Sequence, residues 1–135
     1  MDRSKLEAWA YAALRIVAGF MFSLHGVQKV LGELTTKASP EMWSQLWIGG
    51  VIELVGGVLI ALGLFTRPAA FLSSGTMAVA YIQFHWKGQL GAKLFPISGM
   101  GNGGELSALY CFVFLLLAVG GSGAFSLDRL LRRSS

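Results

Sequence analysis

The chain has 135 residues, of which 54% are hydrophobic and only 13% are charged. Soluble domains carry about 25% charged residues, and a domain of this size leaves about a third of its unfolded surface exposed after folding. The eleven Lys and Arg and the seven Asp and Glu are too few to cover such a surface. The composition therefore excludes a disordered chain and most soluble enzymes, and it indicates an integral membrane protein whose surroundings are the lipid bilayer.

The net charge and the cysteine count exclude further kinds of partner and site. The net charge of +4 comes without a continuous basic run, so it does not indicate a nucleic-acid partner. The single cysteine, Cys111, excludes an intrachain disulfide and a cysteine-rich metal site. Because Cys111 lies in the middle of an apolar run, we interpret it as a small packing residue.

Four windows are long and apolar enough to cross a hydrocarbon core, which requires about 20 residues. The first follows Arg3 and Lys5, as a signal peptide would, but Arg15 interrupts it and no convincing cleavage site comes after it. We therefore expect a retained helix. The sequence predicts one all-α domain over residues 1–135, an integral membrane bundle of four transmembrane helices at residues 8–31, 46–65, 68–86 and 105–125.

The connections between these windows are polar or rich in glycine. Residues 66–68 predict a tight turn in which Pro68 opens the third helix. A longer glycine-rich loop, 87–104, precedes the fourth helix, for which Asn102 is the predicted cap and Glu105 a first-turn acid that favours the helix dipole. Residues 126–135 are predicted to be a tail outside the membrane.

The basic residues predict an orientation. Four spans place both termini on one side of the membrane, and basic residues in short connections favour the cytoplasmic side. We therefore predict a multi-pass protein of the inner membrane with both termini in the cytoplasm, and Trp43, Trp47 and Trp86 as an interfacial belt. The predicted inner side carries Arg3, Lys5, Arg67, Arg129, Arg132 and Arg133, against Lys37, Lys87 and Lys93, with Lys29 near the edge, on the outer side.

The first window has a narrow polar stripe. At about 100° per residue, one face of the helix collects charges, small residues and one aromatic ring, and charged residues at membrane depth normally face the interior of a bundle. We interpret this face as a helix-packing surface, with His25 beside it. Its residues are Arg15, Gly19, Phe22, Gly26 and Lys29.

The second window repeats the pattern with one acid among glycines. Gly50 and Gly57 are spaced by seven, and Glu53 lies between them. An unpaired acid in hydrocarbon is very costly, so we expect Glu53 to neutralise either Arg15 or Lys29 across a helix pair.

All four windows contribute a polar group to the outer half of the predicted bundle, in a layer about 10 Å thick at 1.5 Å of rise per residue. We predict this layer as the site, with Glu53 and His85 as candidate proton relays. No Glu-x-x-His or His-Glu-x-x-His pattern predicts a metal, although His25 and His85 leave haem ligation as a less favoured alternative. The candidate ligand-binding residues are Arg15, His25, Lys29, Glu53, His85, Asn102 and Glu105.

These motifs together resemble the DoxX family of small four-helix membrane proteins. The first window, LRIVAGFMFSLHGVQKVLG, is similar to the opening motif of the family, and the second resembles its glutamate-containing helix and Thr-Arg turn. The segment NGGELSALYCFVFLLLAVGGSGAFSLDRLL resembles its Asn-Gly-Glu start and Ser-Leu-Asp ending. The matching residues are Arg15, Gly19, Gly26, Lys29, Glu53, Arg67, Asn102, Glu105, Ser126, Leu127 and Asp128.

The resemblance implies an accessory subunit in quinone-linked or thiol-linked membrane redox metabolism, since the family takes its name from a subunit associated with an archaeal quinol oxidase. It implies a quinone as a non-covalent ligand and a membrane redox complex as a partner. Two alternatives stay open at this point: a non-catalytic structural or assembly subunit, and a small-solute or proton transporter that works as a homo-oligomer.

Overall fold

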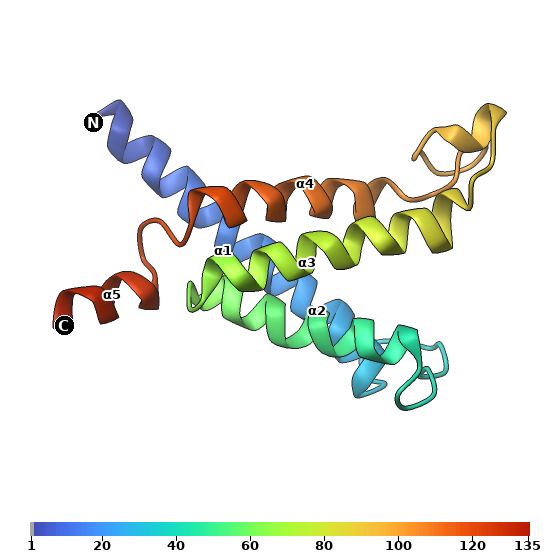
Figure 1. Ribbon diagram of the computed structural model, residues 1–135, viewed down its shortest axis with the longest axis horizontal. Helices are drawn as coiled ribbons and strands as arrows, with labels where there is room; N and C mark the ends of the chain where they lie inside the picture. The colour runs from blue at the N-terminus through green and yellow to red at the C-terminus, as the bar shows by residue number, and fades with distance from the viewer. Residues whose placement is uncertain (1) are drawn as a thin grey trace.

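The computed structural model describes residues 2–135 and contains only helices and their connections in that range, which confirms the all-α prediction. The loops 31–44 and 87–104 lie at one end of the molecule, which we call the loop end (Figure 1). Both termini and the turn between α2 and α3 lie toward the opposite end, the terminal end. The elements are α1 (Arg3–Val30), α2 (Gln45–Leu62), α3 (Thr66–Ala80), the π-helix η1 (Tyr81–Trp86), the 3-10 helix η2 (Gly91–Leu94), α4 (Glu105–Gly120) and α5 (Leu127–Ser134).

Helix α1 begins at Arg3, earlier than the predicted start at residue 8. Asp2 is the N-cap, and its carboxylate accepts hydrogen bonds from the Ser4 hydroxyl at 2.6 Å and the Ser4 amide at 3.3 Å. These bonds, the hydroxyl foremost, hold the pKa of the Asp2 carboxyl below its ordinary value. The cap allows the helix to extend through the polar residues that precede the apolar window.

The turn between α2 and α3 comes earlier than predicted. Gly63 ends α2 in the left-handed conformation (φ 69°), and Phe65 is also left-handed (φ 48°). Thr66 and Arg67 are already helical, so the predicted turn at 66–68 is wrong by three residues. Pro68 still lies in the first turn of α3, where its missing N–H has no helical partner to lose.

A carboxylate from far along the chain closes this turn. Asp128 Oδ1 accepts from the Phe65 amide at 2.9 Å, and Oδ2 accepts from the Thr66 amide at 3.2 Å. The Asp128 amide donates to the Gly63 carbonyl at 2.9 Å. The first turn of α5 therefore caps α3 and fixes the terminal end.

The third predicted span, 68–86, is one continuous helical rod with a change of winding. The rod runs from Thr66 to Trp86; its first fifteen residues are α-helical and its last six, which include His85, are π-helical. A π-helical turn is wider than an α-helical one and is often found at functional sites.

The fourth predicted span is too long at its C-terminal end. Helix α4 ends at Gly120, and Gly121 has a positive φ of 82°, which a residue with a side chain rarely adopts. Residues 121–126 cross the terminal end as an irregular segment, and the predicted tail is the helix α5. Arg129, Arg132 and Arg133 lie on this helix.

The closest backbone contact in the bundle joins α1 and α2. A Cβ atom at Gly19 would lie 2.5 Å from the Ala61 amide nitrogen, and one at Gly57 would lie 2.5 Å from the Ser23 nitrogen. A Cβ at Gly26 would overlap the Leu54 backbone in the same way. This confirms the predicted glycine stripe of α1 as a helix-packing surface.

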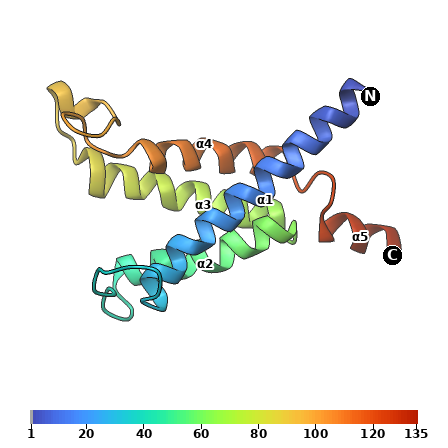
Figure 2. The same ribbon diagram turned by 180° about the vertical axis from the view of Figure 1, so that it is seen from behind.

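Helices α3 and α4 form a second pair. The Ser74 hydroxyl of α3 donates to the Cys111 carbonyl of α4 at 2.7 Å. Phe22 of α1 joins the two helix pairs near the middle of the bundle, where the centroid of its ring lies 4.6 Å from that of Phe114 in α4. The pairs diverge toward the loop end in both views (Figures 1 and 2), so the bundle is tight at its centre and open at the loop end.

Two helices of the described chain are long and apolar enough to cross a membrane: α1 with 28 residues and α2 with 18. Helix α4 is apolar but has only 16 residues, and α3 with 15 reaches the length of a span only together with η1.

We predict that Gly57→Ala lowers the free energy of unfolding by about 1–3 kcal/mol, because the new methyl group overlaps backbone that cannot move independently. Gly49→Ala in the same helix is the matched control, since a Cβ there meets nothing within 4 Å. The measurement is the thermal midpoint of unfolding in a mild detergent. Equal midpoints for the two variants would contradict the close approach of α1 and α2.

Candidate functional site

Arg15 is completely buried near the terminal end and is bound by backbone carbonyls. Its Nη1 donates to the carbonyls of Ile60 and Ala61 at 2.9 and 2.8 Å. Its Nη2 donates to those of Ala124 and Phe125 at 3.0 and 2.8 Å. A planar guanidinium can serve four acceptors in this way, whereas an ammonium presents a single point charge.

These bonds give Arg15 a structural role. The carbonyls of Ile60 and Ala61 are at the C-terminal end of α2, where a cation is favoured by the helix dipole. The other two carbonyls belong to the irregular segment that follows α4. Arg15 therefore ties α1, α2 and this segment together, and it is not the partner of Glu53.

Glu53 pairs instead with Lys29, the other partner that the sequence left open. Lys29 Nζ lies 2.6 Å from Glu53 Oε1, across the contact between α1 and α2. The Glu53 side chain is 3% exposed and the Lys29 side chain is 34% exposed. The carboxylate is thus enclosed by the protein while the ammonium reaches it from a more open position.

A cavity of about 540 Å³ lies beside this ion pair, toward the loop end, and we call it the polar cavity. Ionisable residues of α1, α2 and η1 line it, together with residues from the first two turns of α4. Its polar lining residues are His25, Gln28, Lys29, Thr35, Lys37, Glu53, His85, Ser107 and Tyr110, and its apolar lining includes Phe22, Leu46, Met77, Phe84 and Leu106.

Two buried polar atoms at this cavity have no hydrogen-bond partner among the described residues. They are Glu53 Oε2 and the Tyr110 hydroxyl. Tyr110 is 6% exposed, and its ring stacks on Phe114 at 5.4 Å and lies edge-on to His25 at 6.2 Å. Buried polar atoms are nearly always satisfied, so this acceptor and this hydroxyl are available to a ligand.

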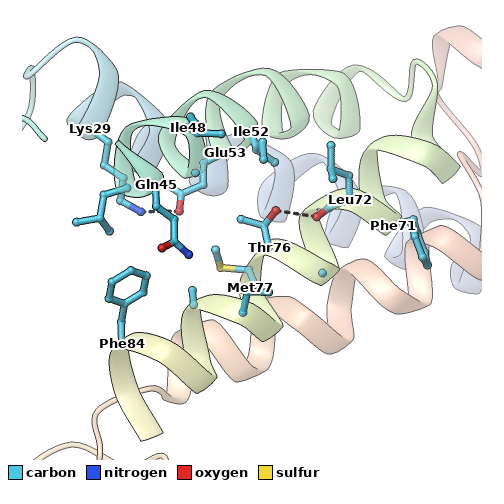
Figure 3. A pocket seen from close by; sticks show the side chains of 15 residues that line it. Lys29, Gln45, Ile48, Ile52, Glu53, Phe71, Leu72, Thr76, Met77 and Phe84 are labelled. Carbon is cyan, nitrogen blue, oxygen red and sulfur yellow. Dashed lines mark hydrogen bonds and ion pairs between the residues drawn. The ribbon is translucent and has the colours of Figure 1, made fainter. Parts of the chain in front are cut away.

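A second cavity of about 370 Å³ lies on the other side of the ion pair, between α2 and α3, and we call it the apolar cavity (Figure 3). Its lining includes Ile48 and Ile52 of α2 and Phe71 and Leu72 of α3. The side chains of Gln45 in α2 and Gln83 in η1 are hydrogen-bonded to each other across the loop end. Both cavities are lined by Lys29, Leu46, Glu53, Met77, Ala80 and Phe84.

Three of the candidate residues do not line either cavity. Arg15 is held near the terminal end, as described above. Glu105 is exposed in the first turn of α4. Asn102 is not the N-cap of α4, which is Gly104; its side chain instead accepts from the Gly104 amide at 2.8 Å and donates to the Tyr81 hydroxyl at 3.0 Å.

The sequence reasoning missed Tyr110 and Ser107. Both are in the apolar window of α4, where the only signal is a hydroxyl in an otherwise hydrophobic run. Which side of α4 faces the ion pair depends on the packing of α3 and α4, which periodicity in a uniformly apolar helix does not determine. Over residues 2–135 the structure contains no cluster of three or more His, Cys, Asp or Glu that could hold a metal ion.

Comparison with known proteins places the chain in a family. The DoxX family model matches residues 10–86, which include most of α1 and all of α2, α3 and η1, with the Lys29–Glu53 pair. The chain belongs to the DoxX family. The relationship confirms the resemblance of the sequence motifs and makes the chain an integral membrane protein by homology.

The chain is similar to three further proteins along most of its length. A protein of Haemophilus influenzae described as uncharacterized is 44% identical over 127 residues, which is 92% of each chain. Inner membrane protein YphA of Escherichia coli is 33% identical over 124 residues, covering 85% of each chain. Inner membrane protein YqjF of the same organism is 30% identical over 135 residues, covering 96% of this chain and 97% of YqjF. No solved structure matches this DoxX-family chain.

We predict that Arg15→Gln lowers the free energy of unfolding by at least about 3 kcal/mol, because hydrogen bonds to a charged group contribute about 1.5–3 kcal/mol each and the carbonyls would lose their donors. Arg67→Gln is the control. Arg67 is exposed to solvent and donates to two carbonyls, those of Ala118 and Val119. Because water can replace exposed hydrogen bonds, the loss of Arg67 costs about 1 kcal/mol. Thermal unfolding in detergent checks both, and a milder effect at Arg15 than at Arg67 would refute the structural role.

Proposed function

We propose that this DoxX-family protein is an integral inner-membrane protein that spans the bilayer four times and binds a quinone-type ring compound beside the Lys29–Glu53 pair. The inner membrane is supported by the names of YphA and YqjF. The four spans are supported by α1 and α2, by the continuous rod of α3 and η1, and by the apolar α4. The basic residues at the terminal end favour cytoplasmic termini.

The observation that carries the ligand class is the position of the ion pair between a polar and an apolar cavity. A quinone has a flat ring with carbonyl oxygens and an apolar tail. The Lys29 ammonium and the Tyr110 hydroxyl supply donors for the carbonyl oxygens in the polar cavity. The apolar cavity, lined by Ile52 and Phe71, suits the tail on its way to the bilayer.

Glu53 is the proton acceptor in this proposal. Its Oε1 is occupied by Lys29, whereas its Oε2 is buried with no partner among the described residues. Proton exchange at Oε2 would accompany the change between a carbonyl and a hydroxyl on the ligand. His85, on the π-helical turn of the same cavity, is positioned to relay that proton toward the loop end.

A quinone fits the site better than a thiol does. Cys111 is absent from the lining of both cavities. Its Sγ lies 3.6 Å from the Ser74 hydroxyl, within the contact between α3 and α4. The role we propose is therefore that of an accessory subunit, which binds and positions a quinol; on oxidation to the quinone, its two electrons pass to a membrane redox partner and its two protons leave in turn through Glu53 and His85.

The test uses the whole protein in mild detergent, titrated with a short-tailed ubiquinone. We expect a saturable rise of the thermal midpoint. Glu53→Gln and Tyr110→Phe each remove one polar contact of about 1.5 kcal/mol, so each should weaken binding about tenfold. Glu105→Gln, an exposed acid outside both cavities, is the matched control and should bind as the unaltered protein does.

Two outcomes would overturn the proposal. If quinone leaves the midpoint unchanged and Glu53→Gln only lowers stability, the ion pair serves structure alone, as an assembly subunit requires. If the protein carries protons or small solutes across liposomes, and Glu53→Gln abolishes this flux without any quinone binding, the chain is a transporter.

A further inference from the structure

A groove at the terminal end, separate from both cavities described above, is lined by basic and apolar side chains. It has a volume of about 950 Å³ and lies between the first turns of α1, the end of α2, the irregular segment after α4, and α5. We call it the terminal groove. None of its lining residues lines the polar or the apolar cavity.

The charge in the terminal groove is of one sign. Lys5 of α1 and Arg129 and Arg133 of α5 line it, and no Asp or Glu does so. Neighbouring acids are engaged elsewhere: Glu7 pairs with Arg3 at 2.8 Å on the exposed side of α1. Asp128 caps α3 and lines a different depression, on the other side of α5. Over residues 2–135 none of the three cations has an ion-pair partner, so all three can serve an anionic ligand.

The walls beneath these cations are apolar. Trp9 is half-exposed, and Leu62, Phe125 and Leu130 line the groove beside it. At about 100° per residue, Leu127 and Leu130 lie on one side of α5, and Arg133 and Arg129 follow next to Leu130 around the helix. An amphipathic helix of this kind lies at the boundary of headgroups and acyl chains. Tryptophan is enriched at the same depth.

We propose that the terminal groove binds one anionic phospholipid. The phosphate lies among Lys5, Arg129 and Arg133, and the acyl chains follow Trp9 and Leu130 toward the hydrocarbon. A soluble anion would use the cations but not the apolar walls, and a zwitterionic lipid would bring a positive group among three positive side chains. The proposal is independent of the quinone site, because the two sites share no residue.

The test compares lipids on the detergent-purified protein by native mass spectrometry and by thermal midpoint. Phosphatidylglycerol should bind at a ratio of one and raise the midpoint, whereas phosphatidylcholine should do neither. The variant K5Q/R129Q/R133Q should weaken phosphatidylglycerol binding at least about tenfold. The control R3Q/K87Q/K93Q removes the same charge from residues outside the groove and should bind like the unaltered protein.

Three results would overturn this assignment. Equal binding of phosphatidylcholine would exclude recognition of an anionic headgroup. Equal losses in the two triple variants would show that only net charge matters. A midpoint rise with glycerol 3-phosphate that matches the rise with lipid would exclude a role for the acyl chains. The substituted side chains are exposed, although Arg3 pairs with Glu7 and Lys93 donates to the Gly101 carbonyl. The lipid-free midpoint of each variant is therefore measured first, and lipid-induced shifts are compared with that value.

Discussion

The close approach of the α1 and α2 backbones is the contact on which the rest of the structure depends. Gly19, Gly26 and Gly57 remove the side chains that would separate the two helices, and this distance brings Lys29 within 2.6 Å of Glu53. The same contact places Arg15 against the last carbonyls of α2. Small residues perform this function in membranes because helices there associate through packing rather than through the hydrophobic effect.

The two buried charged residues of this helix pair, Arg15 and Glu53, differ in how fully they are hydrogen-bonded. Four carbonyls accept hydrogen bonds from the two Nη atoms of Arg15, so its guanidinium fixes the terminal end and has only Nε without a partner among the described residues. Glu53 has one oxygen bound and one without a partner among the described residues. The divergence of the two helix pairs opens cavities on both sides of that carboxylate, of which Figure 3 shows the apolar one. The hydrogen bonds of Arg15 hold the helices in place, and the unpaired oxygen of Glu53 lies in a cavity between them. This is the arrangement expected of a binding site on a rigid scaffold.

Much of this arrangement could be predicted from local pattern. The stripe of Arg15, Gly19, Phe22 and Gly26 follows from helical periodicity, and all four residues are buried. The need of Glu53 for a cation follows from the cost of an unpaired charge in hydrocarbon. The boundaries were less predictable where a distant residue decides them. Asp128 caps a helix that begins at Thr66, and a glycine with positive φ ends α4 at residue 120.

The sequence by itself determined that the chain is a helical membrane protein, which helices carry charge, and that α1 and α2 meet through glycines, because composition and periodicity encode burial directly. Only the tertiary structure decided which cation pairs with Glu53. It also decided that Tyr110 faces the polar cavity and that Asn102 and Glu105 do not line it. These outcomes depend on how two helix pairs cross and diverge. That geometry is the sum of many side-chain contacts between distant segments, and no local pattern records it.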